Sequence, residues 1–88
     1  MDQDELTVEG LLILLATALC IDPSRMNKDT SANDLNEWDS LGTINIITTL
    51  EEGIGIKFDI LDIPLLISVD SIIELLKTKG YSLRSEDQ

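Results

Sequence analysis

The chain has no histidine, only one cysteine and only three aromatic residues among its 88 residues. Without histidine, the commonest general base near neutral pH is missing, so no serine has an imidazole to activate it. The single cysteine, Cys20, excludes an internal disulfide and fits a reducing compartment. The scarcity of Trp, Phe and Tyr means that the core must be aliphatic. These absences count against an enzyme.

Basic residues are also scarce, with six lysines and arginines against 17 acidic residues and a net charge of −11. Nucleic acid and anionic membrane surfaces would repel such a chain. Basic protein partners would be attracted to it. A simpler interpretation is that the acidity keeps a small domain in solution.

Long hydrophobic runs are missing too. The longest run covers residues 11–16 and continues to residue 21 with only Thr17 interrupting it. A transmembrane helix needs about 20 apolar residues, and no basic segment precedes the run as a signal peptide would require. We therefore expect a buried helix, no membrane insertion and a cytoplasmic protein.

Length and periodicity predict one small all-α domain. A first helix is expected over residues 7–20, capped by Thr7 and ended by the sequence Asp22-Pro23-Ser24. Ile13 points away from its apolar face. That face consists of Leu11, Leu14, Leu15, Ala18 and Leu19.

A second helix is expected over residues 40–52, ended by Gly53 and Gly55. Its buried side is predicted to hold Thr43, Ile46, Ile47, Leu50 and Ile54. Its exposed side is predicted to hold Leu41, Ile44, Asn45, Thr48 and Glu52.

The last helix is expected to begin at a Ser68 cap and to stop at Gly80. Pro64 limits residues 59–67 to one short turn of helix, and no strong cap precedes it. The expected fold is therefore a small bundle of three main helices and one short helix. Residues 6–80 form its ordered core, and residues 82–88 form a flexible tail.

A long polar loop over residues 22–39 joins the first two helices, with Met26 and Leu35 as expected core anchors. Its carboxylates suggest a calcium loop starting at Asp29. The sixth position of such a loop would be Asp34 instead of glycine, and the twelfth would be Ser40 instead of glutamate. No metal site is therefore predicted.

The triplet Asp39-Ser40-Leu41, preceded by Trp38, is the most informative motif. It places a serine hydroxyl in the first turn of a helix, where unpaired N–H groups and a partial positive charge favour a phosphate. Since no base accompanies it, Ser40 is interpreted as an attachment point for a group and not as a nucleophile.

The spacing around this triplet resembles the acyl carrier protein family over residues 6–80. The match continues through Thr43, Ile44, Ile46, Leu50, Glu51, Glu52, Gly55 and Ile56. Upstream it includes Leu19, Ile21, Met26, Asp34 and Leu35, and downstream Ser68 and Val69.

The resemblance implies that Ser40, flanked by Asp39 and Leu41, carries 4′-phosphopantetheine. A magnesium-dependent phosphopantetheinyl transferase would supply this group from coenzyme A. Its thiol would hold an acyl or aminoacyl group as a thioester, and the carrier itself would catalyse nothing. Acyl- or aminoacyl-loading ligases and acyltransferases would meet a partner face made of Leu41, Ile44, Thr48 and Glu52. A monomer is expected.

Some positions depart from the family pattern. Gly42, Asn45 and Gly53 stand where the family usually has acidic residues, and residues 64–67 replace a charged third helix. These departures favour a specialised carrier of a lipid, polyketide or surface-modification pathway over housekeeping fatty acid biosynthesis.

Three other interpretations differ in class or cargo. One is an aminoacyl carrier, D-alanyl or peptidyl. Another is an unmodified helical adaptor that uses the same exposed face. An enzyme with Cys20 as nucleophile would lack an activating base, and Cys20 is expected to be a small apolar filler.

Overall fold

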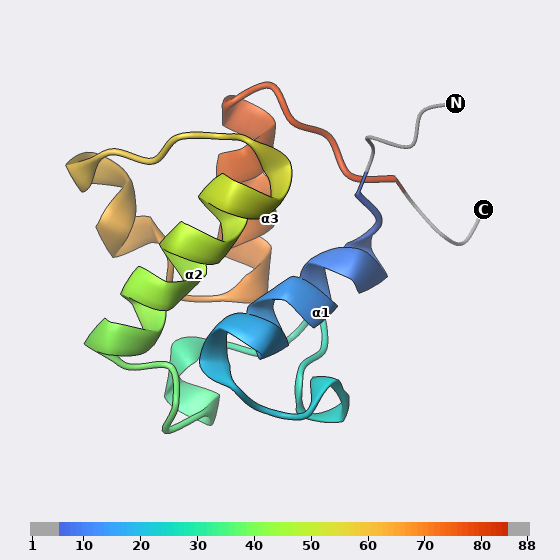
Figure 1. The fold of residues 1–88 in the computed structure, drawn as a ribbon, viewed down its shortest axis with the longest axis vertical. Helices are drawn as coiled ribbons and strands as arrows, with labels where there is room; N and C mark the ends of the chain where they lie inside the picture. Colours follow the sequence, from blue (N-terminus) through green and yellow to red (C-terminus); the bar gives the residue numbers. More distant parts are fainter. Residues whose placement is uncertain (1–5, 85–88) are drawn as a thin grey trace.

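The computed structural model describes residues 6–84, which form three α-helices and three short 3-10 helices without a strand (Figure 1). The α-helices are α1 (Val8–Leu19), α2 (Ser40–Ile54) and α3 (Val69–Thr78). The 3-10 helices are η1 (Pro23–Arg25), η2 (Ala32–Asp34) and η3 (Ile60–Leu65). The predicted all-α class, with three main helices and one short helix at residues 59–67, is confirmed, whereas η1 and η2 were not predicted.

Aliphatic side chains from all three α-helices form the core. The fully buried ones include Leu11, Leu15, Ile46, Leu50, Val69, Ile72 and Leu76. Met26 and Leu35 reach the same core from the long loop, as predicted, and Trp38 joins them with only 4% of its surface exposed. Within residues 6–84 no helix has the length and apolar character needed to cross a bilayer.

α1 begins as predicted and ends differently. The Thr7 hydroxyl accepts a hydrogen bond from the Gly10 N–H at 2.9 Å. At the other end Cys20 adopts a left-handed conformation (φ 60°) and its N–H donates to the Thr17 carbonyl, while the Ile21 N–H donates to the Ala16 carbonyl. This pair of bonds is a Schellman motif, so the helix stops before Asp22 and Pro23. Cys20 is exposed, and its expected role as a buried filler is wrong.

The long loop is internally organised. Arg25 in η1 donates two hydrogen bonds, of 3.0 and 3.1 Å, to the carboxylate of Glu37. Farther along, the loop runs beside the start of α3, where the Val69 N–H donates to the Thr30 carbonyl and the Ala32 N–H donates to the Ile67 carbonyl. These bonds tie the loop to α3 and bring it back to the start of α2.

α2 is slightly longer than expected. Gly53 lies inside it, and Gly55 ends it with a left-handed backbone (φ 75°). Beyond this end, the carboxylate of Glu51 accepts a hydrogen bond from the Phe58 N–H at 2.9 Å. The extended residues between α2 and η3 are therefore fastened back onto α2.

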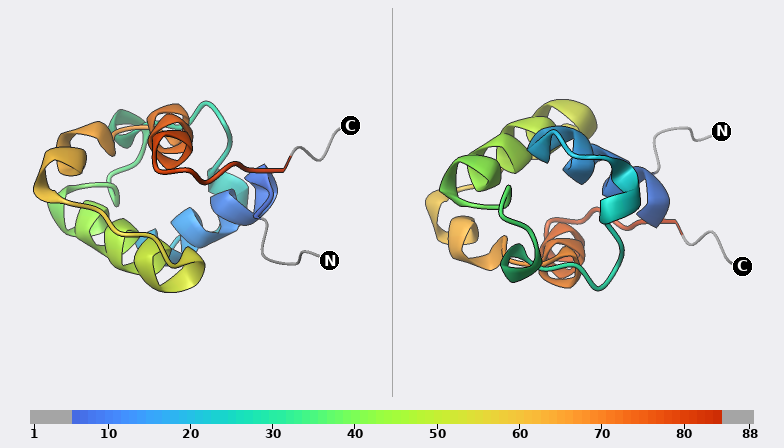
Figure 2. Two further views of the ribbon diagram at one scale, coloured as in Figure 1. Left: turned by 90° about the horizontal axis from the view of Figure 1, so that it is seen from above. Right: turned by 90° about the horizontal axis from the view of Figure 1, so that it is seen from below.

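η3 is held against α3 (Figure 2). The Asp59 N–H donates to the Asp62 carboxylate at 2.9 Å, so the segment does have a cap, contrary to the expectation. The ammonium of Lys79 lies 2.8 Å from the same carboxylate and 5.5 Å from the centre of the Phe58 ring. The ion pair joins η3 to the end of α3, and the ring contact places Phe58, just before η3, beside the same lysine.

The segment after α3 makes contacts as far as residue 84. The Arg84 N–H donates to the Leu6 carbonyl at 2.9 Å, and Leu83 packs against the core. These two contacts lie within the stretch 82–88 that was expected to be a flexible tail, and its flexibility stays a prediction. Residues 85–88 lie outside the described part of the chain.

Acid should loosen η3 before it loosens α2. Hydrogen bonds from Lys79, and then from the Asp59 backbone, hold the pKa of Asp62 below its ordinary value of 3.8. A lowered folded-state pKa adds stability above the unfolded pKa, and this stability is lost as the pH falls through the folded value. Below about pH 4, amide protection in residues 59–67 should therefore fall relative to residues 43–52.

The measurement is hydrogen exchange followed by NMR at a series of pH values. Asp62→Asn should remove this pH dependence. Glu74→Gln is the matched control, because Glu74 lies 3.6 Å from Lys77 on an exposed stretch of α3, and it should keep the dependence. A parallel loss of protection in both segments would show that the Asp62–Lys79 pair does not hold η3.

Candidate functional site

Ser40 is the first residue of α2 and is exposed. Asp39 precedes it as the N-cap: its carboxylate accepts a hydrogen bond from the Gly42 N–H at 2.9 Å, and its carbonyl accepts one from the Thr43 N–H at 2.8 Å. The N–H groups of Ser40 and Leu41 have no acceptor within the helix, because none exists for the first turn. No hydrogen bond joins the Ser40 hydroxyl to residues 6–84, and the residue stands at the start of α2, an end that favours anions.

A close contact fixes the chain just before Ser40. Gly42 is buried, and a Cβ built on it would collide with the carbonyl oxygen of Glu37 and lie 2.8 Å from Cδ2 of Leu19. The loop backbone therefore lies directly on the first turn of α2. This contact also corrects the interpretation of Gly42 as a lost surface charge, since no side chain fits at this position.

Trp38 provides the second anchor of the loop. Its ring is buried, and its indole N–H has no hydrogen-bond partner among the described residues. An unpaired buried donor costs about 1–3 kcal/mol, whereas a buried aromatic ring removes about 150–250 Å² from water. Packing area outweighs the lost hydrogen bond, so Trp38 serves as an apolar anchor two residues before Ser40.

An ion pair between Arg25 and Glu37 stabilises the same loop. The Arg25 guanidinium holds the pKa of Glu37 below its usual value through their hydrogen bonds, and Glu37 raises the pKa of Arg25. Glu37 is thus paired with Arg25, and the Asp39 carboxylate caps the helix. Neither carboxylate is arranged as a base for the Ser40 hydroxyl, and the chain has no histidine. The arrangement is suited to carrying a group on Ser40.

The predicted partner face of α2 is exposed. Leu41 and Ile44 leave 66% and 54% of their surfaces in solvent. Thr48 and Glu52 are exposed on the same side of the helix, together with Asn45. Glu52 is the one exposed acidic residue of α2, since Glu51 is partly buried and bonded to Phe58. The face is therefore largely apolar near Ser40.

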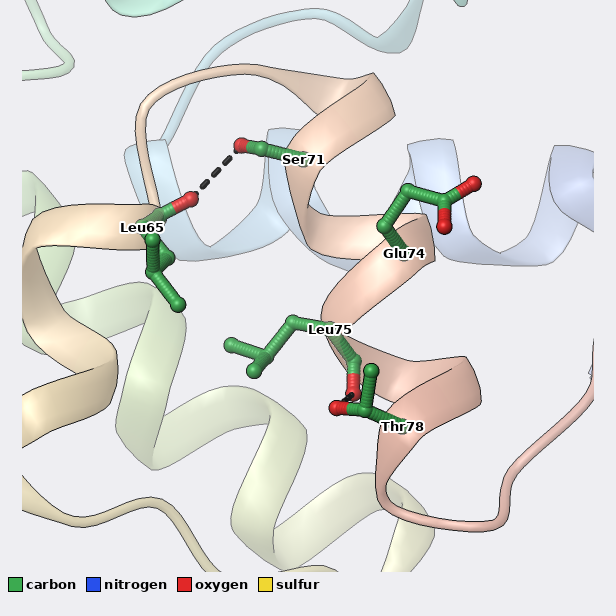
Figure 3. Close-up of a pocket in the computed structure, with 5 residues that line it drawn as sticks. All are labelled: Leu65, Ser71, Glu74, Leu75 and Thr78. Atoms are coloured by element: carbon green, nitrogen blue, oxygen red, sulfur yellow. Dashed lines mark hydrogen bonds between the residues drawn. The ribbon is translucent and has the colours of Figure 1, made fainter.

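A small apolar pocket lies between η3 and α3, and its lining includes none of the residues predicted for the site. Its volume is about 290 Å³, and Leu65, Ser71, Glu74, Leu75 and Thr78 line it (Figure 3). No pattern in the sequence indicates this pocket, because it depends on how η3 lies against α3. Most apolar side chains of residues 60–67 are exposed, an orientation that the sequence analysis does not predict.

The geometry of the described residues and the comparisons with known proteins were both searched for further indications of function. Within residues 6–84, no three His, Cys, Asp or Glu side chains are grouped so that they could hold a metal ion. Comparisons with protein-family models, curated proteins and solved structures found no match. Function has to be inferred from the residues and their geometry.

The contact at Gly42 should be sensitive to a single methyl group. Gly42→Ala should lower the free energy of unfolding by about 1–3 kcal/mol, the usual cost of overpacking. Gly53→Ala is the matched control in the same helix, because its Cβ would meet nothing closer than 3.7 Å. It should raise stability by roughly 0.5–1 kcal/mol, since glycine is a poor helix former. Urea unfolding measures both changes, and equal effects of the two alanines would refute the close contact.

Proposed function

We propose that the protein is a carrier whose Ser40 holds a 4′-phosphopantetheine group and, through it, an acyl or related intermediate. The observation that carries the proposal is the placement of Ser40: an exposed, unbonded hydroxyl at the start of a helix whose preceding loop is fixed by Trp38, Asp39 and Gly42. The sequence pattern around it, which resembles acyl carrier proteins, supports the same conclusion.

The residues at this position fit a phosphodiester. The first-turn N–H groups and the positive end of the helix dipole favour a negative group on Ser40. The Asp39 carboxylate is bonded to the Gly42 N–H, so it stabilises the start of the helix. When bound, the phosphopantetheine arm supplies a thiol that holds its cargo as a thioester. Ser40 anchors that arm at the protein surface, and Leu41 and Ile44 lie beside it for partner enzymes.

The exposed face of α2 favours a specialised pathway in lipid, polyketide or surface modification. With Gly42 buried and position 53 directed toward Leu14 of α1, Asn45 is the departure that reduces the acidity of this face. Leu41 and Ile44 would make an apolar contact. Such a contact suits a dedicated loading enzyme better than an enzyme that binds its carrier through a basic patch. An aminoacyl carrier has the same architecture, because the loading enzyme selects the cargo. An unmodified adaptor would use the same face without any group on Ser40.

Modification of Ser40 is tested by intact mass. Wild-type protein incubated with coenzyme A and a broad phosphopantetheinyl transferase should gain the mass of one phosphopantetheinyl group. Ser40→Ala should stay at the unmodified mass and fold normally, because exposed substitutions usually change stability by less than about 0.5 kcal/mol. Ser24→Ala, in an exposed loop position, should gain the group like the wild type. Unmodified wild-type protein would favour the adaptor.

The partner face is tested by a charge placed on it. Ile44→Glu should lower the rate of modification or loading about tenfold, because a central apolar contact is typically worth more than 1 kcal/mol. Its stability should stay within about 0.5 kcal/mol of the wild type. Ile13→Glu is the matched control, since Ile13 on α1 is 48% exposed and should leave the rate unchanged. Equal losses in both variants would remove α2 as the partner face.

A further inference from the structure

Arg25 and Glu37 join the two ends of the long loop. The guanidinium donates two hydrogen bonds, of 3.0 and 3.1 Å, one to each oxygen of the Glu37 carboxylate. Arg25 belongs to η1, which follows α1, whereas Glu37 belongs to the last residues before Ser40. The pair therefore connects the region after α1 with the residues that lead into α2.

Arg25 extends from a segment whose backbone is held. The Asp22 carboxylate accepts a hydrogen bond from the Ser24 N–H at 2.9 Å, and the Asp22 carbonyl accepts one from the Arg25 N–H at 2.9 Å. Met26, the next residue, is buried in the core, and η1 contacts α1. The guanidinium is therefore presented from a fixed point.

Glu37 makes contact through two different groups. Its carboxylate binds Arg25, and its backbone carbonyl lies against Gly42 in the first turn of α2. The N–H of the same glycine donates to the Asp39 carboxylate at 2.9 Å. A movement of the Glu37 backbone would therefore reach the turn that carries Ser40.

Fold stability is a weak reason for the pair. The side chains of Arg25 and Glu37 are 47% and 38% exposed, and exposed ion pairs contribute little to the free energy of unfolding. Leu35 and Trp38 are buried and already anchor the loop. A guanidinium that binds both carboxylate oxygens does impose a defined geometry. Its hydrogen bonds also hold the pKa of Glu37 below its usual range, so the pair is charged at neutral pH.

We propose that Arg25 is a positioning residue for group transfer to Ser40, and that it acts through Glu37 and the contact at Gly42. This inference rests on the proposed function. In the transfer from coenzyme A, the Ser40 oxygen forms a bond to phosphorus, the pyrophosphate bond breaks and adenosine 3′,5′-bisphosphate leaves. The hydroxyl proton passes to a base of the transferase. Such a displacement requires an aligned attacking oxygen, and the Arg25–Glu37 pair orients the residues that present it.

The test compares kcat/KM for modification by coenzyme A and a broad phosphopantetheinyl transferase, followed by intact mass. Arg25→Ala and Glu37→Ala should each lower kcat/KM about fivefold, because a misplaced attacking group slows the reaction. The double variant should lose no more than either single variant, since both remove the same interaction. Lys28→Ala is the matched control. It removes the same charge from an exposed position of the same loop and should keep the wild-type rate.

A second measurement is independent of the transferase. In the unmodified protein, Arg25→Ala should shift the NMR amide signals of Ser40, Leu41 and Gly42 and leave those of residues 8–16 unchanged. Its urea midpoint should stay close to that of the wild type. A role in overall stability would instead lower the midpoint without a local change at the start of α2.

The outcomes separate this inference from the proposed function. Wild-type protein that gains no group would remove both. A modified wild type with an equal rate in Arg25→Ala, or with no amide shifts at the start of α2, would overturn the positioning role alone. A slow Arg25→Ala beside a normal Glu37→Ala would mean that Arg25 contacts the transferase directly. An equal loss in Lys28→Ala would reduce the effect to net charge. If Arg25→Ala misfolds, Glu37→Ala decides by the same two measurements.

Discussion

The contact between Gly42 and the backbone of Glu37 is the constraint on which the candidate site depends. It allows the last residues of the long loop to lie on the first turn of α2, so the loop enters the helix in one direction. Trp38 is buried beside this contact, and Asp39 then caps the helix at 2.9 Å. A side chain at position 42 would push the loop away and change where Ser40 stands. The close packing just before Ser40 therefore requires a glycine at position 42.

The sequence predicts the helices well because their signals are local. Thr7 and Ser68 are hydroxyl caps followed by apolar periodicity, and both cap their helices in the structure. The same locality explains the errors. A left-handed Cys20 is rare for a residue with a side chain, and periodicity carries no trace of it. The pairing of residues 82–84 with Leu6 joins the two ends of the described chain, which no short window reveals.

For the candidate site, the sequence predicts which residues are exposed. It does not predict the tertiary contacts that hold the backbone in place. The exposure of Leu41 and Ile44 follows from the helical period alone. In the sequence, Gly42 resembles a missing surface charge. Only the tertiary contact with the Glu37 carbonyl shows that no side chain fits at this position. The ion pair between Asp62 and Lys79 is not predictable from the sequence, because the two residues lie on different elements. The pocket beside Leu65 is lined by residues of both η3 and α3, so no local pattern predicts it.

Different contacts order the backbone at the start of α2 and at η3, the two places where apolar side chains are exposed. Asp39 and Gly42 fix the start of α2, whereas Asp62 and Lys79 fix η3. Fully burying one leucine is worth about 1.5–3 kcal/mol, and Leu61 at 79% exposure gains only a small part of this. Polar residues at such positions would therefore cost the fold little stability. The chain nevertheless keeps apolar side chains at Leu41, Ile44 and Leu61, and hydrogen bonds or ion pairs order the backbone near them.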